Sequence, residues 1–205
     1  MELFVFPVGH VLLYPQFSKP FHIFEARYVQ MVEDSIANKV PIAIASVYEP
    51  FGRHEFRVGE PLNFAHNIVG YGTPLIVERL PDQSVVIFLE GRGKARLGQV
   101  LDRTQPYLVC EAEPLTENLQ LSGASTVTFQ TAHKVLVHWL YQHIQDAHSR
   151  DQFLNYVKTP EQVIGCFASY LVKDPDLQQV ILESDDINEK VIIINRLIQS
   201  GELVA

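Results

Sequence analysis

Residues 3–36 constrain the fold of this chain more than any other stretch. Residues 3–6 form an apolar run that predicts a first strand, ending near Pro7. A second apolar run, residues 11–14, stops at Pro15. The short piece that follows has an extended character and leads directly into an amphipathic pattern. The chain is therefore expected to open with extended segments that deliver it into a helix.

A helix is predicted over residues 23–38, because apolar side chains recur there at steps of three and four residues. The members of this apolar stripe are Phe24, Tyr28, Met31, Val32 and Ile36. At the start of the helix, Glu25 and Arg27 are spaced for an ion pair, and the spacing of His22 and Glu25 suits a local hydrogen bond. We interpret these three polar residues as structural, and acid–base chemistry is the alternative.

The residues from 42 to 115 read mainly as β-strands. Residues 42–47 and 85–89 are apolar on both faces and predict strands that are buried on both sides. Residues 107–113 alternate between apolar and polar side chains, as a half-buried strand does. About six short strands with one helix predict an α+β domain over residues 1–115, built as a small barrel or rolled sheet.

Residues 48–66 interrupt this pattern with prolines, glycines, mixed charges and aromatic residues. Such a composition predicts an irregular, exposed excursion, and loops carry binding residues more often than strands do. The alternative is structural, with Phe51, Phe56 and Phe64 packing the excursion onto the core. Both interpretations stay open at the level of sequence.

The composition changes near Pro114, and the alternating pattern does not return. Residues 118–205 instead show helical periodicity and predict a bundle of about four or five helices. Thr159-Pro160 and Asp174-Pro175 each combine an N-cap side chain with proline at the first helical position. A last helix is expected over residues 186–200, with Gly201 as its stop signal.

Composition bounds the classes of function. The chain is 47% hydrophobic with a net charge of −8, which excludes a disordered chain and disfavours generic nucleic-acid binding. No apolar run reaches the roughly 18 residues of a membrane span, and the N-terminus fits a secretory signal badly. We therefore expect a soluble, cytoplasmic protein with no membrane partner.

Glycines and basic residues meet in the stretch Gly91-Arg92-Gly93-Lys94. A phosphate-binding loop would need glycine at Phe88 and a hydroxyl residue after Lys94, so we predict a turn between two strands. Arg92, Lys94 and Arg96 share one face if the segment is extended. They form either a solvated face or, alternatively, an anion-binding patch.

No metal, cofactor or catalytic site is expected. His133, His138, His143 and His148 lie on one predicted helix at five-residue steps, which rotate successive rings by about 140° and keep them from converging. Cys110 and Cys166 are interpreted as small buried apolar residues, with a disulfide as the alternative. There is no Gly-x-Ser-x-Gly nucleophile elbow, so hydrolysis is the weakest of the functional hypotheses.

Taken together, the opening motifs resemble the N-terminal, substrate-binding domain of the Lon proteases. The matching pieces are Phe6-Pro7-Val8-Gly9, the apolar run to Pro15, and Phe21-His22-Ile23-Phe24-Glu25-Ala26-Arg27-Tyr28. Gly72-Thr73, Leu80-Pro81-Asp82 and the final helix with its preceding Glu183-Ser184-Asp185 follow in the order of that family. Ala26, Gln16 and Gln83 depart from its usual residues. The resemblance implies a PUA-like barrel followed by a helical bundle.

The same resemblance implies a freestanding, non-catalytic module that binds unfolded or apolar polypeptide segments, with a protease or chaperone as a further partner. The chain contains neither the ATPase nor the peptidase domain of the Lon proteases. Candidate binding residues are the loop aromatics Phe17, Tyr48, Phe51 and Phe56, because aromatic side chains supply contact area at a low entropic cost. The alternative is a PUA-like small-molecule or RNA binder, with the basic residues Arg92, Lys94 and Arg96 as phosphate contacts.

Overall fold

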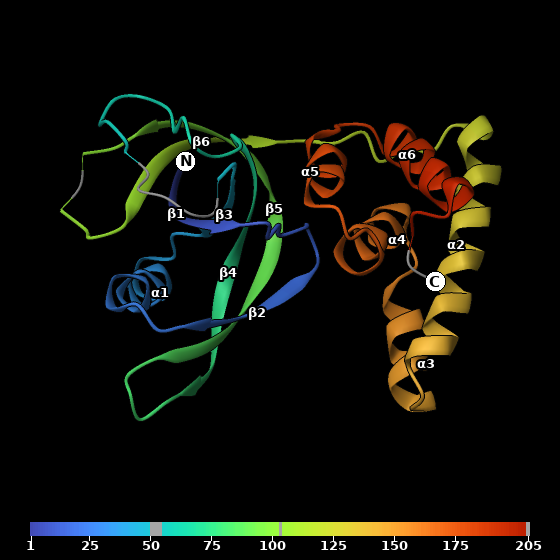
Figure 1. Cartoon of the computed structure of the whole chain (residues 1–205), viewed down its shortest axis with the longest axis horizontal. Helices are drawn as coiled ribbons and strands as arrows, with labels where there is room; N and C mark the ends of the chain where they lie inside the picture. The colour runs from blue at the N-terminus through green and yellow to red at the C-terminus, as the bar shows by residue number, and fades with distance from the viewer. Residues whose placement is uncertain (50–54, 103, 204–205) are drawn as a thin grey trace. The chain divides into compact units, whose positions relative to one another are not determined.

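The computed structural model describes residues 1–49, 55–102 and 104–203, and the chain divides into two compact units, Met1–Leu115 and Thr116–Ala205 (Figure 1). The first unit contains β1 (Glu2–Gly9), β2 (Ser18–Ile23), α1 (Ala26–Asn38), β3 (Ile42–Val47), β4 (Ile68–Arg79), β5 (Val85–Val100) and β6 (Leu108–Leu115). The second contains α2 (Gly123–His143), α3 (Ala147–Tyr156), α4 (Pro160–Cys166), the π-helical turn η1 (Phe167–Leu171), α5 (Pro175–Glu183) and α6 (Ile187–Ser200). The predicted α+β class and six-stranded sheet are confirmed.

Strand pairing closes most of the sheet on itself. The strand order is β2-β5-β4-β3-β1-β6, and β5 also pairs with β6. β5, β4, β3, β1 and β6 therefore form a ring, while β2 is added to β5 outside it. β1 and β3 run parallel, and the other pairs are antiparallel. Among the described residues, β2 and residues 73–79 of β4 each pair with β5 on one side and have a free edge on the other.

Two apolar cores lie on opposite faces of this sheet. The core inside the ring is built mainly from Leu3, Val5, Ala43, Ala45, Val69, Ala95, Leu97 and Cys110. The core between the sheet and α1 is built mainly from Phe4, Ile42, Ile44, Ile87, Leu89, Val109, Met31 and Val32. Because side chains alternate along a strand, β1 and β3 supply both cores and are buried on both faces. The burial predicted for residues 42–47 is confirmed.

The apolar segment before Pro15 crosses the sheet where β4 and β5 have glycines. A Cβ atom added to Gly70 would collide with the carbonyl oxygen of Leu13, and one added to Gly91 with that of Tyr14. The backbone of Gly91 also exchanges hydrogen bonds with the crossing segment, donating to the carbonyl of Phe17 at 2.8 Å. The glycines therefore permit a close backbone approach that holds the segment flat against the sheet.

Several predicted boundaries are wrong. The turn expected at residues 91–94 does not exist, because β5 runs through it with only a register shift against β4. The first strand does not end near Pro7 but continues to Gly9, paired along its length with β3. The helix expected from residue 23 begins at Ala26.

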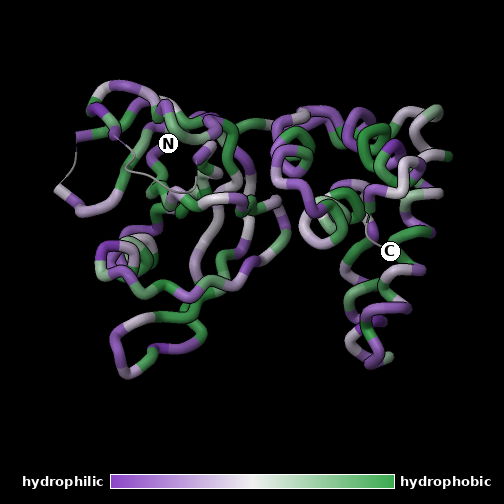
Figure 2. The backbone as a smooth tube through the Cα atoms, viewed as in Figure 1, coloured by the Kyte–Doolittle hydropathy of each residue, from purple (hydrophilic) through white to green (hydrophobic). Residues whose placement is uncertain are grey.

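The apolar stripe predicted for α1 is only partly correct. Tyr28, Met31 and Val32 are buried, but Ile36 is exposed, and Phe24 precedes the helix and is 70% exposed. The reason is that Glu25 has an extended backbone and acts as the N-cap, so Phe24 belongs to the end of the β2 segment. Figure 2 shows hydrophilic and hydrophobic residues alternating around the turns of α1.

Local sequence signals set the helices of the second unit. Thr159 accepts a hydrogen bond from the backbone of Gln162 and completes a capping box, and Asp174 caps α5. α6 begins after Asp186 and ends at Gly201, whose φ is 75°. The expected cap signals and the last helix are confirmed. No helix in the described ranges is long and apolar enough to span a membrane.

Candidate functional site

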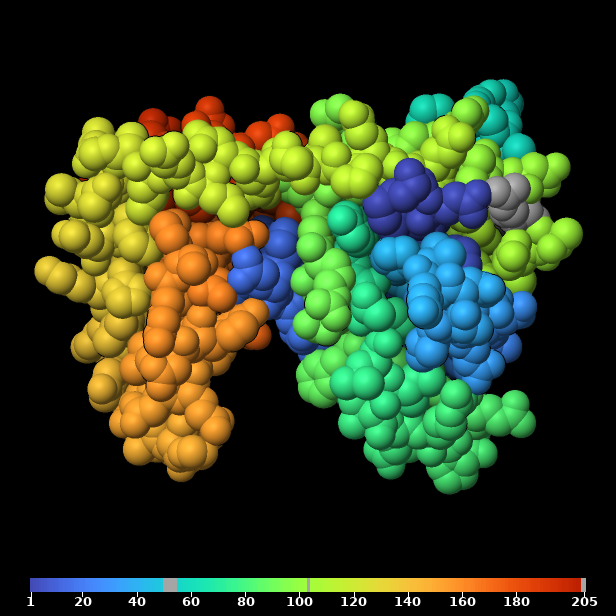
Figure 3. All heavy atoms as spheres, turned by 180° about the vertical axis from the view of Figure 1, so that it is seen from behind, coloured from blue at the N-terminus to red at the C-terminus, as the bar shows by residue number. Residues whose placement is uncertain are grey.

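The hairpin formed by β4 and β5 extends beyond the ring and exposes a face that is buried farther along the same strand. Val69 points into the core of the ring, and Leu75, six residues on and therefore on the same face, is 64% exposed. Val77 is exposed as well. Figure 3 shows the end of this hairpin as a protrusion of the first unit. The face of the sheet thus changes from core to solvent along β4.

Apolar side chains lie in register across three strands on this exposed face. Pro20 of β2 pairs with Phe88 of β5, and Phe88 pairs with Leu75 of β4. Phe88 is 42% exposed, and Pro20 is exposed too. Directly paired residues have their Cβ atoms about 5 Å apart, so the three side chains form one continuous surface. We call Pro20, Phe88, Leu75 and the neighbouring Val77 the apolar row.

The opposite face of the same strands fixes the register of the apolar row. Ile23, Ile87 and Leu89 are buried against α1 and its core. A slip of one residue would bring these buried side chains to the solvent, so the pairing is strongly specified. The apolar row is therefore held on a rigid sheet that is apolar on both faces.

A second line of residues borders the apolar row on the side of the hairpin turn. His22 pairs with Val86, and Val86 pairs with Glu78. A register shift between Ile76 and Glu78 lies in this line. Since a β-bulge sets two residues opposite one, Val77 and Glu78 both lie beside Val86. The border of the apolar row is thus partly charged.

A hydrogen-bond chain ties β2 to the hairpin turn. His22 Nε2 lies 2.8 Å from Ser84 Oγ, and Ser84 Oγ donates to Asp82 Oδ1 at 2.7 Å. Because the single hydroxyl proton of Ser84 points to Asp82, His22 Nε2 is the donor toward Ser84. The hydrogen bonds from Ser84 hold the pKa of Asp82 below its usual value. Ser84 is buried, and the carboxylate that accepts its proton is a weak base because its pKa is lowered, so this trio lacks the arrangement of an activated nucleophile.

Phe24 stands next to this chain of hydrogen bonds. The rings of His22 and Phe24 have centroids 6.1 Å apart. A cavity of about 360 Å³ lies between the start of α1 and the β4–β5 turn. Its lining residues are Phe24, Ala26, Val29, Gln30, Glu33, Asp82 and Gln83. The cavity therefore continues the exposed surface beyond the border of the apolar row.

The motif residues of the opening stretch pack against one another and within the sheet of the first unit. The ring of Phe6 packs against Tyr28 with centroids 4.5 Å apart and against Phe21 at 5.9 Å. Glu25 and Arg27 form the expected ion pair at 2.7 Å. Pro7 and Gly9 lie in β1, opposite Ala45 and Val47. The sequence suggested a hydrogen bond between His22 and Glu25. In the structure, His22 is hydrogen-bonded to Ser84 instead.

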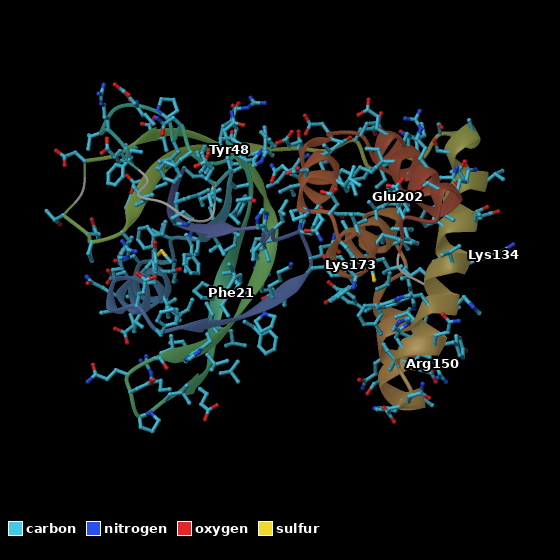
Figure 4. All side chains as sticks on the ribbon, in the orientation of Figure 1. Phe21, Tyr48, Lys134, Arg150, Lys173 and Glu202 are labelled. Atoms are coloured by element: carbon cyan, nitrogen blue, oxygen red, sulfur yellow. The ribbon has the colours of Figure 1, made fainter. Side chains whose placement is uncertain are left out.

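The predicted loop aromatics divide into different environments. Phe17 is 4% exposed, so the expectation that it presents a free contact surface is wrong, because the Gly91 backbone draws this segment onto the sheet. Tyr48 and Phe56 are exposed, together with Val58. Phe51 lies outside the described residues. In Figure 4, Tyr48 and Phe21 of β2 lie far apart, so the exposed loop residues form a surface distinct from the apolar row.

This second surface, the loop surface of Tyr48, Phe56 and Val58, has its own polar surroundings. The ring of Tyr48 packs edge-on against His66 with centroids 4.7 Å apart. A cavity of about 590 Å³ lies beside Phe56, and charged residues of the segment 55–63 line much of it. The predicted packing of Phe64 onto the core is observed, since it contacts the core inside the ring.

The basic residues of β5 do not form the shared exposed face expected of them. Arg92 pairs with Glu90 at 2.9 Å, and Arg96 approaches Glu113 at 3.6 Å. Lys94 is only 2% exposed. The prediction of a shared face assumed that side chains alternate strictly along β5. Arg92 lies at the register shift between β4 and β5, so it does not follow this alternation. This arrangement offers little for phosphate contacts.

The histidines and cysteines show no convergent chemistry. His133, His138 and His143 lie on α2, whereas His148 lies on α3, which corrects the prediction of one helix. Within the described ranges, no cluster of three or more side chains could hold a metal ion. Cys110 and Cys166 are both buried free thiols, and burial raises the pKa of each to about 12.

Sequence reasoning missed the apolar row. Residues 85–89 were expected to be buried on both faces, but Phe88 is exposed and Val86 is half-buried. An uninterrupted apolar run does not reveal which of its faces is covered. The signal that was available is Leu75 and Val77 in the neighbouring strand, whose spacing places both on one face.

The apolar row is an exposed apolar surface on a sheet, and a surface of this kind is a candidate binding site. Comparison of the sequence with family models places residues 2–200 in one family. The chain belongs to the family of the ATP-dependent protease La (LON) substrate-binding domain. A search of curated proteins finds no significant match.

Solved structures show the same fold. The N-terminal domain of the Lon protease from the Mycobacterium avium complex has a TM-score of 0.73 at 13% identity and covers 100% of both chains. A Lon N-terminal domain protein from Xanthomonas campestris has a TM-score of 0.67 at 14% identity, with 97% of this chain and 98% of that chain covered. At such low identity the likeness concerns the fold alone.

Proposed function

We propose that this chain is a non-catalytic module that binds unfolded or apolar polypeptide segments on the apolar row. The observation that carries this proposal is the register of Pro20, Phe88 and Leu75 across three strands on an exposed face. Single exposed apolar residues are common on proteins, whereas a continuous apolar surface more often marks a binding site. The family, whose domain is described as substrate-binding, supports the same function.

The chemistry of the apolar row suits an extended segment without a fixed sequence. Phe88 supplies a broad aromatic face, and Leu75 and Val77 supply aliphatic area on either side of the β-bulge. Because the hydrophobic effect is not directional, such a surface accepts many apolar side chains with similar free energies. A few partly exposed side chains give weak and reversible binding, as a module that hands on its clients to a protease or chaperone partner needs.

The proposal also covers the two domains of the chain, its lack of catalysis and its location. We infer a PUA-like barrel for domain 1–115 and a helical bundle for domain 118–205, as the resemblance implies. The burial of both thiols, which raises the pKa of each to about 12, supports binding without catalysis. A cytoplasmic location stays a prediction.

The loop surface is the second candidate for the same activity. Tyr48, Phe56 and Val58 are exposed on one irregular segment and its flank. They lack the in-register arrangement of the apolar row, so they offer a less continuous contact area. An experiment must therefore compare the two surfaces directly.

The test uses a fluorescently labelled, permanently unfolded protein, such as reduced and carboxymethylated α-lactalbumin, and measures its anisotropy as this chain is titrated. We expect the double variant Leu75→Ser and Phe88→Ser to weaken binding about thirtyfold, because two apolar contacts of the order of 1 kcal/mol each are lost. The matched double variant Tyr48→Ser and Phe56→Ser should bind like the wild type.

The outcomes separate the candidates. Loss of binding in the loop variant alone would move the site to the loop surface. Absence of binding by the wild-type chain would refute polypeptide recognition altogether. A labelled RNA in the same assay tests the alternative function, and its salt-sensitive binding would favour that alternative.

A further inference from the structure

The cavity between the start of α1 and the β4–β5 turn has a composition different from that of the apolar row. One side is formed by Phe24, whose ring is 70% exposed although it follows directly on a buried residue, Ile23. The other sides carry the carboxylates of Asp82 and Glu33 and the amides of Gln30 and Gln83. The cavity thus combines an aromatic face with acidic groups and hydrogen-bond acceptors.

Around this cavity, carboxylates outnumber basic side chains. Glu33 is paired with Arg79 at 2.8 Å, and Glu25 is paired with Arg27 at 2.7 Å. Asp82 accepts hydrogen bonds from the Ser84 backbone and hydroxyl and lies near His22, and these groups stabilise its ionised form. Glu78, on the border of the apolar row, adds a further exposed carboxylate. The surroundings therefore favour a cation.

His22 connects the wall of the cavity at the end of the sheet with the border of the apolar row. The ring of His22 faces Phe24, and its Nε2 atom binds Ser84, which in turn holds Asp82. On its other side, His22 pairs with Val86 beside Phe88. An extended peptide that lies on the apolar row can therefore reach the cavity with a neighbouring side chain.

We propose that this cavity binds the lysine or arginine side chain of a polypeptide whose apolar residues occupy the apolar row. The ring of Phe24 offers a cation–π contact, and the Asp82 carboxylate offers an ion pair. This inference rests on the proposed function and gives it a substrate class, namely apolar segments with an adjacent basic residue. An adjacent acidic residue would be repelled by the same groups.

The experiment compares three short labelled peptides that share one apolar core and carry lysine, norleucine or glutamate beside it, at either end in separate sets. For the wild-type chain at low salt, we expect the lysine peptide to bind about fivefold more tightly than the glutamate peptide, as exposed ion pairs allow. High salt should reduce this ratio toward one, because it screens exposed charges.

Two variants assign the preference to the cavity. Phe24→Ala removes the aromatic face, and Asp82→Asn removes the charge while its remaining oxygen still accepts from Ser84. Each should lower the ratio of lysine to glutamate affinity to about twofold or less, with the affinity for the norleucine peptide retained. Ile36→Ala, at the exposed far end of α1, is the matched control and should keep the wild-type ratio.

The design distinguishes failure of this inference from failure of the proposed function. Equal affinity for all three peptides, with binding still weakened by Phe88→Ser, would overturn the cation site and leave the apolar row in place. A lysine preference that persists in both cavity variants would also overturn it. Binding of none of the peptides, and of no unfolded protein, would instead refute the proposed function.

Discussion

Gly70 offers a direct test of how the segment before Pro15 is held on the sheet. Gly70 has no positive φ, so alanine can adopt the same backbone conformation. Without steric conflict, the replacement would stabilise a strand by about 0.5–1 kcal/mol. The added Cβ atom, however, would collide with the carbonyl group of Leu13, which is backbone and cannot rotate away. Overpacking of this kind costs about 1–3 kcal/mol, and a backbone obstacle places the cost at the upper end.

The expected net effect of Gly70→Ala is therefore a destabilisation of about 2 kcal/mol. Gly98→Ala is the matched control in β5, because the nearest atom to its added Cβ lies at 3.4 Å, in ordinary contact with Glu111. It should leave stability unchanged or raise it by a few tenths of a kcal/mol. Hydrogen exchange of the amides of β4 and β5, followed by mass spectrometry, measures both variants within the first unit.

The same glycine-to-alanine change is expected to lower stability at position 70 and to preserve it at position 98. Faster exchange throughout β4 and β5 in Gly70→Ala, with protection retained in Gly98→Ala, is the expected result. Equal protection in both variants would show that the Leu13 backbone does not lie against Gly70. In that case the account of how the opening stretch is fixed would be wrong.

Three further predictions concern buried and capping groups. Glu117→Gln should destabilise the second unit by about 3 kcal/mol in thermal unfolding, because it removes the negative charge that lies 2.7 Å from the buried Lys190 ammonium. Cys110 and Cys166 should not react with a thiol reagent at pH 8 until the protein is denatured, since pKa values of about 12 leave almost no thiolate. The helical circular dichroism signal should weaken below about pH 4 and less so in Asp186→Asn, because the lowered pKa of Asp186 stabilises the fold only while its carboxylate is ionised.

Local signals allowed much of the fold to be predicted from the sequence. The caps at Thr159 and Asp174 depend on residues within one helical turn, and both are correct. The alternation in β6 is likewise local, and its two faces enter different cores, with Cys110 inside the ring and Val109 toward α1. The family resemblance was carried by motifs that now prove to pack around one another, such as Phe6 and Tyr28.

The errors arise where distant parts of the chain decide the outcome. Phe17 looked like an exposed loop aromatic, but the Gly91 backbone hydrogen-bonds to Phe17 and Gln16 and holds the segment on the sheet, where Phe17 is buried. Phe88 looked like a core residue, but one face of β5 is left uncovered beyond the ring. Neither the crossing segment nor the projection of the hairpin has a local pattern, so periodicity could not place these two side chains.

The exposed position of Phe88 bears on function because the fold does not require an apolar residue there. Packing against α1 is supplied by Ile87 and Leu89 on the other face of β5, and a polar β-former such as threonine would keep the strand. Phe88 leaves 42% of its surface exposed at this site, and such an exposed apolar side chain adds to the risk of aggregation. The same holds for Leu75, which pairs with Phe88 directly. Two such residues in register, bordered by exposed acidic groups, are best explained by a polypeptide partner that covers them.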